Sequence, residues 1–399
     1  MSDPWLLLLL FAAIAIGWIL GRGTRHGSGH GSETAMYPQY YRGLNFLLND
    51  QPDGALDVFI QALEVNSETL ETHLAVGNLM RRKGEVERAI RIHQNLLARP
   101  SLPREHLHQA HLELARDFIS AGLLDRAERL LEDLLREAPE LRDISRRHLL
   151  EIYQDEKEWQ KAIETGRQLL PRKSILKAAQ PVESDTGVAL AHYCCELAES
   201  VWARNDYHAV REYLKQALGY DRRCVRAMLL LAKVEYETGR YLKAIKALRR
   251  VAEQDPVFLS EAVDLLRDCY EKIGDPQGFH DFMAMALETG PSATILLALV
   301  EDIQAREGGD AAADFIGREL KHRPSLKGLA KLVELNIANS DGRARENLTI
   351  LQLLIRQLLQ NKPAYRCGHC GFSGKQLHWL CPGCKHWGQM RAIRGAEGE

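Results

Sequence analysis

A repeat with a period of 34 residues is the feature that most constrains the fold of this chain. In the second half, small or apolar residues recur at this step where the first helix of each unit would lie: Ala198, Ala232, Leu266 and Val300. A parallel set falls on the second helices: Val210, Ala244, Gly278 and Ala312. One helical hairpin cannot bury its apolar face, but stacked hairpins share a continuous core. The period therefore predicts an all-α solenoid built from paired helices.

The same pattern begins less regularly at about residue 36, where Gly43 and Gly77 are the first pair at this step. It breaks between Pro171 and Gly187, which predicts a bend between two sub-arrays. A final helix pair is expected up to residue 361. The repeats resemble those of the tetratricopeptide repeat family, and the resemblance covers about residues 36–361.

Near the C-terminus, four cysteines form two Cys-x-x-Cys pairs with ten residues between them: Cys367, Cys370, Cys381 and Cys384. Each pair can fold as a tight turn that points two thiolates at one ion, and two such turns complete a tetrahedral site. Protein would fill all four positions, so the site is expected to be structural or redox-active and not hydrolytic. Iron and zinc both accept four thiolates, and two disulfides are the alternative to metal.

Other residues near these cysteines support a small folded module. Gly371 follows the first pair and Pro382-Gly383 fills the second, which suits tight turns. Four aromatic side chains are expected to cover the cluster with apolar surface: Tyr365, Phe372, Trp379 and Trp387. The remaining cysteines lie on apolar helical faces and are expected to be buried free thiols: Cys194, Cys195, Cys224 and Cys269.

An apolar run from Trp5 to Leu20 precedes the repeats. Its length is at the short end for a membrane span. A cleaved signal peptide is the rival interpretation, but no lysine or arginine precedes the run. Arg22 and Arg25 follow it, so the positive-inside rule places the N-terminus in the periplasm and the C-terminal body in the cytoplasm. The sequence therefore predicts a single-pass anchor and a Gly- and Ser-rich tether.

The expected organisation is an anchor at 1–21, a linker at 22–35, repeats at 36–361, a rubredoxin-like module with four cysteines at 362–390, and a tail at 391–399.

No catalytic motif is present: the sequence has no Gly-rich phosphate loop, no H-E-x-x-H and no nucleophile elbow. A tethered protein-binding scaffold is therefore the leading hypothesis. Alternatives are an electron carrier that uses iron in the four-cysteine site, and a nucleic-acid-binding zinc ribbon. The ribbon would use the basic residues Lys375, Lys385, Arg391 and Arg394, but a net charge of −2 and the anchor argue against it.

Together, the apolar run, the repeats and the knuckles Cys367-Gly-His-Cys370-Gly and Cys381-Pro-Gly-Cys384 resemble the lipopolysaccharide assembly protein B family of Gram-negative bacteria. The resemblance spans essentially the whole chain. It implies a non-enzymatic inner-membrane scaffold that restrains lipopolysaccharide synthesis. Members of this family bring a substrate, the deacetylase that commits carbon to lipid A, to a membrane AAA+ metalloprotease. They also contact other lipopolysaccharide assembly and transport proteins. It also implies iron as the bound metal, with zinc as the alternative.

Overall fold

The computed structural model describes residues 45–46, 54, 58, 70–98, 102–170, 185–290, 292–360, 362–396 and 398. The expected anchor at 1–21 and linker at 22–35 lie outside these residues. Within them, no helix is both long enough and apolar enough to cross a membrane. The chain divides into two compact units, residues 1–145 and 146–399.

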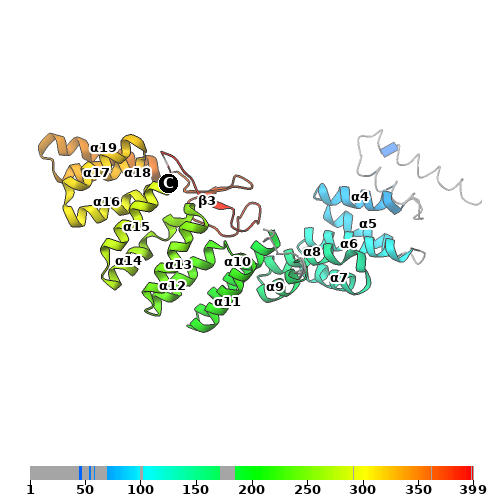
Figure 1. Ribbon diagram of the computed structural model, residues 1–399. Helices are drawn as coiled ribbons and strands as arrows, with labels where there is room; N and C mark the ends of the chain where they lie inside the picture. The colour runs from blue at the N-terminus through cyan, green and yellow to red at the C-terminus, as the bar shows by residue number, and fades with distance from the viewer. Residues whose placement is uncertain are drawn as a thin grey trace, which may run out of the picture. The chain divides into compact units, whose positions relative to one another are not determined.

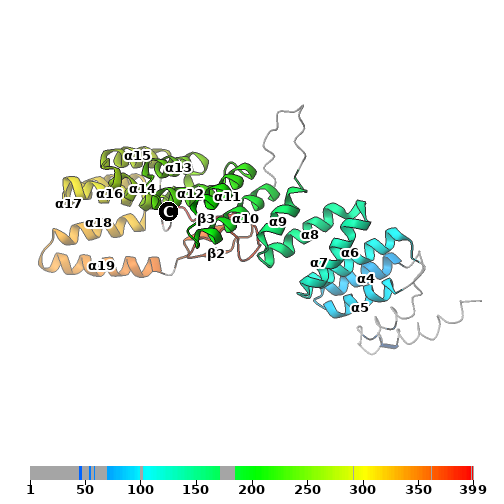
Figure 2. The same cartoon turned by 90° about the horizontal axis from the view of Figure 1, so that it is seen from below.

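The first unit consists of helical hairpins (Figures 1 and 2). Its helices are α4 (Leu70–Arg82), α5 (Val86–Leu97), α6 (Arg104–Ser120) and α7 (Leu124–Glu137), followed by the 3-10 turn η1 (Pro139–Leu141). Helix α8 (Arg142–Asp155) begins in this unit and ends in the second. Consecutive helices α4 and α5 pack together, as do α6 and α7, which confirms the helical hairpins expected from the repeat.

The second unit continues the hairpins (Figure 1). After α8, the helices are α9 (Trp159–Arg167), α10 (Asp185–Trp202), α11 (Tyr207–Tyr220), α12 (Val225–Glu237), α13 (Tyr241–Gln254), α14 (Val263–Ile273), α15 (Pro276–Thr289), α16 (Ala293–Glu307), α17 (Gly309–His322), α18 (Leu326–Ala338) and α19 (Gly342–Gln360), with the 3-10 helix η2 (Pro256–Glu261) after α13. Helix α10 begins at Asp185, inside the expected break, and residues 171–184 lie outside the described part.

The 34-residue step marks buried positions of the helices in this unit. The four first-helix residues have no exposed surface, and neither have three of the four on the second helices: Ala198, Ala232, Leu266, Val300, Val210, Ala244 and Ala312. The fourth, Gly278, is half-buried. Small side chains at these points let neighbouring helices approach, and larger ones such as Leu266 fill the shared core. The 34-residue period in the sequence therefore identifies residues of the solenoid core.

The four cysteines lie in a small module after α19. Its strands are β1 (Tyr365–Cys367), β2 (Ser373–Gly374) and β3 (Met390–Ala392), in the order β2-β1-β3. Both pairings are antiparallel, with Tyr365 opposite Gly374 and Cys367 opposite Met390. The pairing continues to Ala392, two residues beyond the boundary expected at 390.

Candidate metal centre and its docking surface

The two Cys-x-x-Cys segments fold as matching knuckles. In the first, the backbone N–H of Cys367 donates to the carbonyl of Phe372 at 2.7 Å, and Gly371 donates back to Cys367 at 3.0 Å. In the second, Cys381 donates to His386 at 3.0 Å and Lys385 to Cys381 at 2.9 Å. The donors and acceptors have the same spacing in both segments, so each knuckle turns its two sulfurs toward those of the other.

Each knuckle needs a left-handed residue directly after its second cysteine. Gly371 supplies it in the first, with φ +79°, as the sequence indicated. In the second the residue is Lys385, with φ +55°. A non-glycine residue in this region costs on the order of 1–3 kcal/mol and persists only where its surroundings hold it there. The Nζ atom of Lys385 lies 2.6 Å from Oδ2 of Asp155 on α8, which provides such a contact.

The four sulfurs have the spacing of a tetrahedral metal site. Sγ of Cys367 lies 3.7 Å from Sγ of Cys384, and Sγ of Cys370 lies 3.6 Å from Sγ of Cys381. A metal–sulfur distance of about 2.3 Å in a regular tetrahedron separates the sulfurs by roughly 3.8 Å. Disulfide sulfurs are only about 2.0 Å apart, and all four cysteines are free. The donor set therefore fits a single Zn²⁺ or iron ion and does not fit two disulfides.

Backbone amides favour a thiolate at the first cysteine. Burial of the Cys367 thiol opposes ionisation, but hydrogen bonds from the backbone of Cys370 and His369 prevail and lower its pKa to about 7. The thiolate is the form that binds metal. Cys367 and Cys381 are buried, whereas Cys384 is half-buried and Cys370 is exposed, so the centre has an inner and an outer side.

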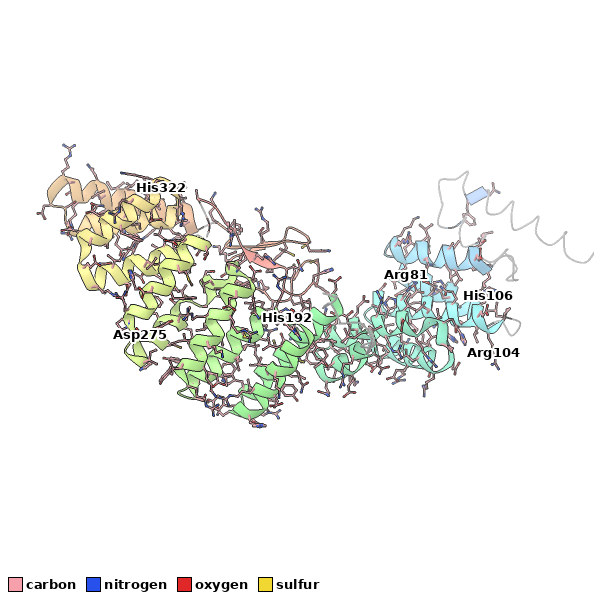
Figure 3. All side chains as sticks on the ribbon, in the orientation of Figure 1. Arg81, Arg104, His106, His192, Asp275 and His322 are labelled. Atoms are coloured by element: carbon pink, nitrogen blue, oxygen red, sulfur yellow. The ribbon has the colours of Figure 1, made fainter. Side chains whose placement is uncertain are left out.

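Two tryptophans of the module dock it onto the repeats. The Trp387 ring stacks on His192 of α10 with centroids 4.9 Å apart, and its Nε1 donates to Oε1 of Gln154 at 2.7 Å. Trp379 stacks on Phe258 of η2 with centroids 5.5 Å apart. Figure 3 labels His192 where α10 faces the module. The sequence predicted that these aromatics cover the cysteines, whereas their rings pack against repeat helices.

Polar contacts surround this aromatic docking surface. Arg391 pairs with Asp255 at 3.0 Å, and the hydroxyl of Tyr365 donates to Glu261 at 2.5 Å. Beyond the strands, the backbone N–H of Leu326 donates to the carbonyl of Ala396 at 2.7 Å. Lys385 and Arg391, two of the basic residues considered for nucleic-acid binding, are thus paired with carboxylates of this chain.

Burial and a cation keep His192 neutral. Its side chain is enclosed, and desolvation together with the nearby Arg226 guanidinium lowers its pKa to about 3. Arg226 is itself buried and pairs with Glu196 at 2.8 Å and Glu199 at 3.0 Å. The docking surface therefore combines a neutral imidazole with a neutralised arginine, which suits a largely apolar contact.

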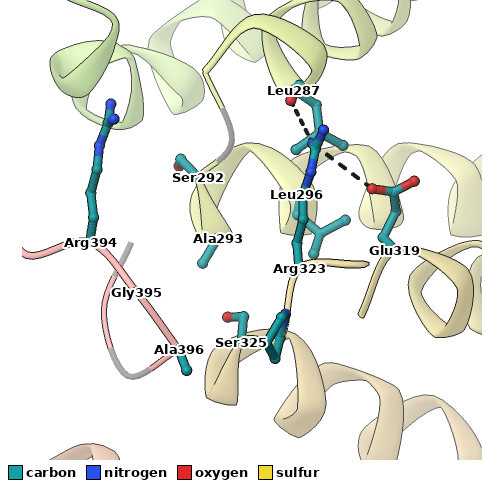
Figure 4. A pocket seen from close by; sticks show the side chains of 11 residues that line it. Leu287, Ser292, Ala293, Leu296, Glu319, Arg323, Ser325, Arg394, Gly395 and Ala396 are labelled. Carbon is teal, nitrogen blue, oxygen red and sulfur yellow. Dashed lines mark hydrogen bonds and ion pairs between the residues drawn. The ribbon is translucent and has the colours of Figure 1, made fainter. Parts of the chain in front are cut away.

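A cavity of about 380 Å³ lies where the chain leaves the module (Figure 4). Helices α16 and α17 and the segment from Arg394 to Ala396 line it, and Arg323 donates to the carbonyl of Leu287 at 2.7 Å across one wall. None of the four site cysteines lines this cavity.

Curated relatives align with nearly the full length of this chain. Lipopolysaccharide assembly protein B of Escherichia coli K12 is 36% identical over 394 residues, which cover 98% of this chain and 99% of the relative. The protein of the same name from Haemophilus influenzae is 34% identical over 98% of both chains. The chain belongs to the lipopolysaccharide assembly protein B family. This confirms the resemblance drawn from the repeats and knuckles.

Family matches to segments agree with this assignment. Residues 72–106, 112–175 and 195–257 match tetratricopeptide repeats, and residues 365–392 match the rubredoxin metal binding domain. The last match ends where β3 ends. The chain therefore joins an array of tetratricopeptide repeats to a rubredoxin metal binding domain.

The remaining cysteines behave as expected. Cys194, Cys195, Cys224 and Cys269 are all buried and free. Burial, with the charge of Cys224 as a smaller cause, raises the pKa of Cys194 to about 12, and burial raises that of Cys269 to about 11. Such thiols are poor nucleophiles. The contact between His192 and Trp387 was not predicted, because a lone histidine on an apolar helix face gives no signal in the sequence.

Proposed function

We propose that this protein is an adaptor tethered to the inner membrane, with its N-terminus in the periplasm and its repeats in the cytoplasm. It restrains lipopolysaccharide synthesis by bringing the lipid A-committing deacetylase to a membrane AAA+ metalloprotease, and it contacts other lipopolysaccharide assembly and transport proteins. Full-length similarity to lipopolysaccharide assembly protein B is the observation that carries this proposal. The apolar run at Trp5–Leu20 supports the tether.

The metal has a structural role in this proposal. Cys367, Cys370, Cys381 and Cys384 bind one ion, iron or alternatively zinc, and the ion fixes the two knuckles. The sulfur spacings of 3.6 and 3.7 Å support this ligand set. The fixed module in turn holds Trp379 and Trp387 against η2 and α10. The metal therefore stabilises the contact between the module and the repeats.

Helix α19 offers a surface for a protein partner. Ile355 is the one buried residue of this fully described helix. Five large aliphatic side chains are between 41% and 57% exposed: Ile350, Leu351, Leu353, Leu354 and Leu358. Terminal repeats of solenoids usually have a polar outer face, and contiguous exposed apolar residues mark interaction sites. We assign the α19 stripe, meaning these five residues, to partner binding.

Capture experiments test the adaptor role. The full-length protein should retain the protease and the deacetylase from detergent-solubilised membranes. Leu354→Asp with Leu358→Asp should abolish capture of at least one of them while leaving the protein folded. Gln216→Asp with Gln304→Asp adds the same charge to exposed positions of α11 and α16, outside the α19 stripe, and should leave capture intact. Failure of the wild-type protein to retain either partner would refute the proposal.

A further inference from the structure

The two knuckles differ on their outer sides in a way that their shared fold does not require. On one side, the rings of His369 and His386 stack with centroids 3.9 Å apart and planes 19° apart. By the matching of the knuckles, the equivalent positions on the other side are Gly383 and Phe372. There a Cβ on Gly383 would lie 3.4 Å from Cβ of Phe372, in ordinary contact. The matching fold is therefore compatible with a glycine and a phenylalanine at these two positions. On the other side of the module, the same two positions hold imidazoles.

The imidazole pair lies beside a sulfur. One ring nitrogen of each histidine and Sγ of Cys384 lie within 4.8 Å of one another. Nδ1 of His386 is 2.8 Å from the carbonyl oxygen of Cys384. A carbonyl only accepts hydrogen bonds, so Nδ1 carries a proton, and in the neutral ring Nε2 keeps its lone pair. Histidines that bind metal usually have their other ring nitrogen held in this way.

The donors are also accessible and adjustable. Both histidines are exposed, and Cys384 is half-buried. Metal–nitrogen distances of about 2.0 Å in a tetrahedron place donor atoms roughly 3.3 to 3.6 Å apart. Exposed imidazoles can reach that spacing by side-chain rotation, since terminal χ angles of histidine are broad.

We propose that His369, His386 and Cys384 form a second transition-metal site, which shares the Cys384 sulfur with the four-cysteine set. Two imidazoles and a thiolate suit divalent ions of borderline softness such as Zn²⁺ and Co²⁺. The fourth position faces solvent and takes water, so the ion is exchangeable. The site is independent of the adaptor function and binds metal whether or not the α19 stripe binds partners.

Cobalt titration tests this site. The reduced full-length protein is first loaded with one equivalent of Zn²⁺, which thiolates prefer to Co²⁺, and then titrated with Co²⁺. The wild-type protein should bind one further equivalent and develop a sulfur-to-cobalt charge-transfer band. His369→Gln with His386→Gln should lose both. His378→Gln alters another histidine of the module, outside the donor group, and should retain both.

Three results would overturn the inference. One is the absence of a second equivalent in the wild-type protein. Another is a second equivalent that survives His369→Gln with His386→Gln. The third is histidine-dependent binding without the charge-transfer band, which would remove Cys384 from the site. Retention of one zinc per chain by every variant shows that the module remains folded, and unchanged partner capture separates this result from the adaptor proposal.

Discussion

Cys381 has no exposed surface and belongs to the second knuckle. Replacing it with serine removes one of four thiolates and leaves the others without a tetrahedral partner. Structural metal supplies about 10–16 kcal/mol of folding free energy in small modules. Cys381→Ser should therefore lose the metal and unfold residues 362–396, as measured by metal analysis and limited proteolysis.

Cys269→Ser is the matched control for this change, because Cys269 is equally buried but lies on α14. It should keep one metal ion and a protease-resistant module. Full metal content and an intact C-terminus in Cys381→Ser would contradict the assigned ligand set.

The burial of His192 makes the docking surface sensitive to acid. Its pKa is about 3 in the folded protein, against 6.5 for a free side chain. Between these values the unfolded chain binds one more proton than the folded chain, so the free energy of unfolding falls as the pH falls. At most, the free energy of unfolding falls by about 1.4 kcal/mol for each pH unit. Above pH 6.5, His192 contributes no pH dependence, because it is neutral in both the folded and the unfolded chain.

His192→Phe keeps an aromatic ring against Trp387 and removes the titrating group. Denaturant unfolding of both proteins between pH 7 and pH 5 should give a smaller loss of stability in the variant than in the wild-type protein. Equal slopes would show that His192 is protonated or accessible in the folded protein.

Helix packing depends on small residues at particular positions of each element. A Cβ on Gly77 of α4 would lie 2.4 Å from Nε2 of His93 on α5. The His93 ring cannot move freely, because its Nδ1 lies 2.5 Å from Oδ2 of Asp117. Gly77→Ala should therefore destabilise the protein by about 1–3 kcal/mol, the usual result of overpacking.

Gly317 of α17 provides the comparison. A Cβ there meets no atom of the described chain within 4 Å. Gly317→Ala should therefore raise the free energy of unfolding by about 0.5–1 kcal/mol through helix propensity. Thermal unfolding of both variants measures the difference, and an equal effect of the two substitutions would contradict the packing account.

Local sequence patterns predicted the repeat helices and the cysteine knuckles. They did not predict how the module packs against the repeat helices. The 34-residue step identified Ala198 and its equivalents because each hairpin repeats the same core. The knuckles were visible because the two cysteines of each pair lie close in sequence. The contact of Trp387 with His192 joins residues almost 200 positions apart, and no local pattern encodes it. Lys385 was missed as a left-handed residue because its contact with Asp155 exists only in the folded chain.

At the scale of the whole molecule, residues of the described repeats and of the module form buried apolar cores. Deleting residues 1–21 should therefore leave a soluble, folded protein. It should nonetheless fail to support lipopolysaccharide control in cells, because tethering raises the effective concentration near membrane partners. Complementation of a depleted strain at native expression level is the measurement. Full function of the untethered protein would show that the anchor is dispensable.

Deacetylase lifetime in living cells tests the adaptor proposal most directly. After depletion of this protein, a pulse-chase measurement should show a prolonged deacetylase half-life and a rise in lipopolysaccharide. The wild-type protein and Gln216→Asp with Gln304→Asp should restore rapid turnover, whereas Leu354→Asp with Leu358→Asp should not. An unchanged half-life on depletion would contradict the account and leave only a repeat scaffold of other purpose.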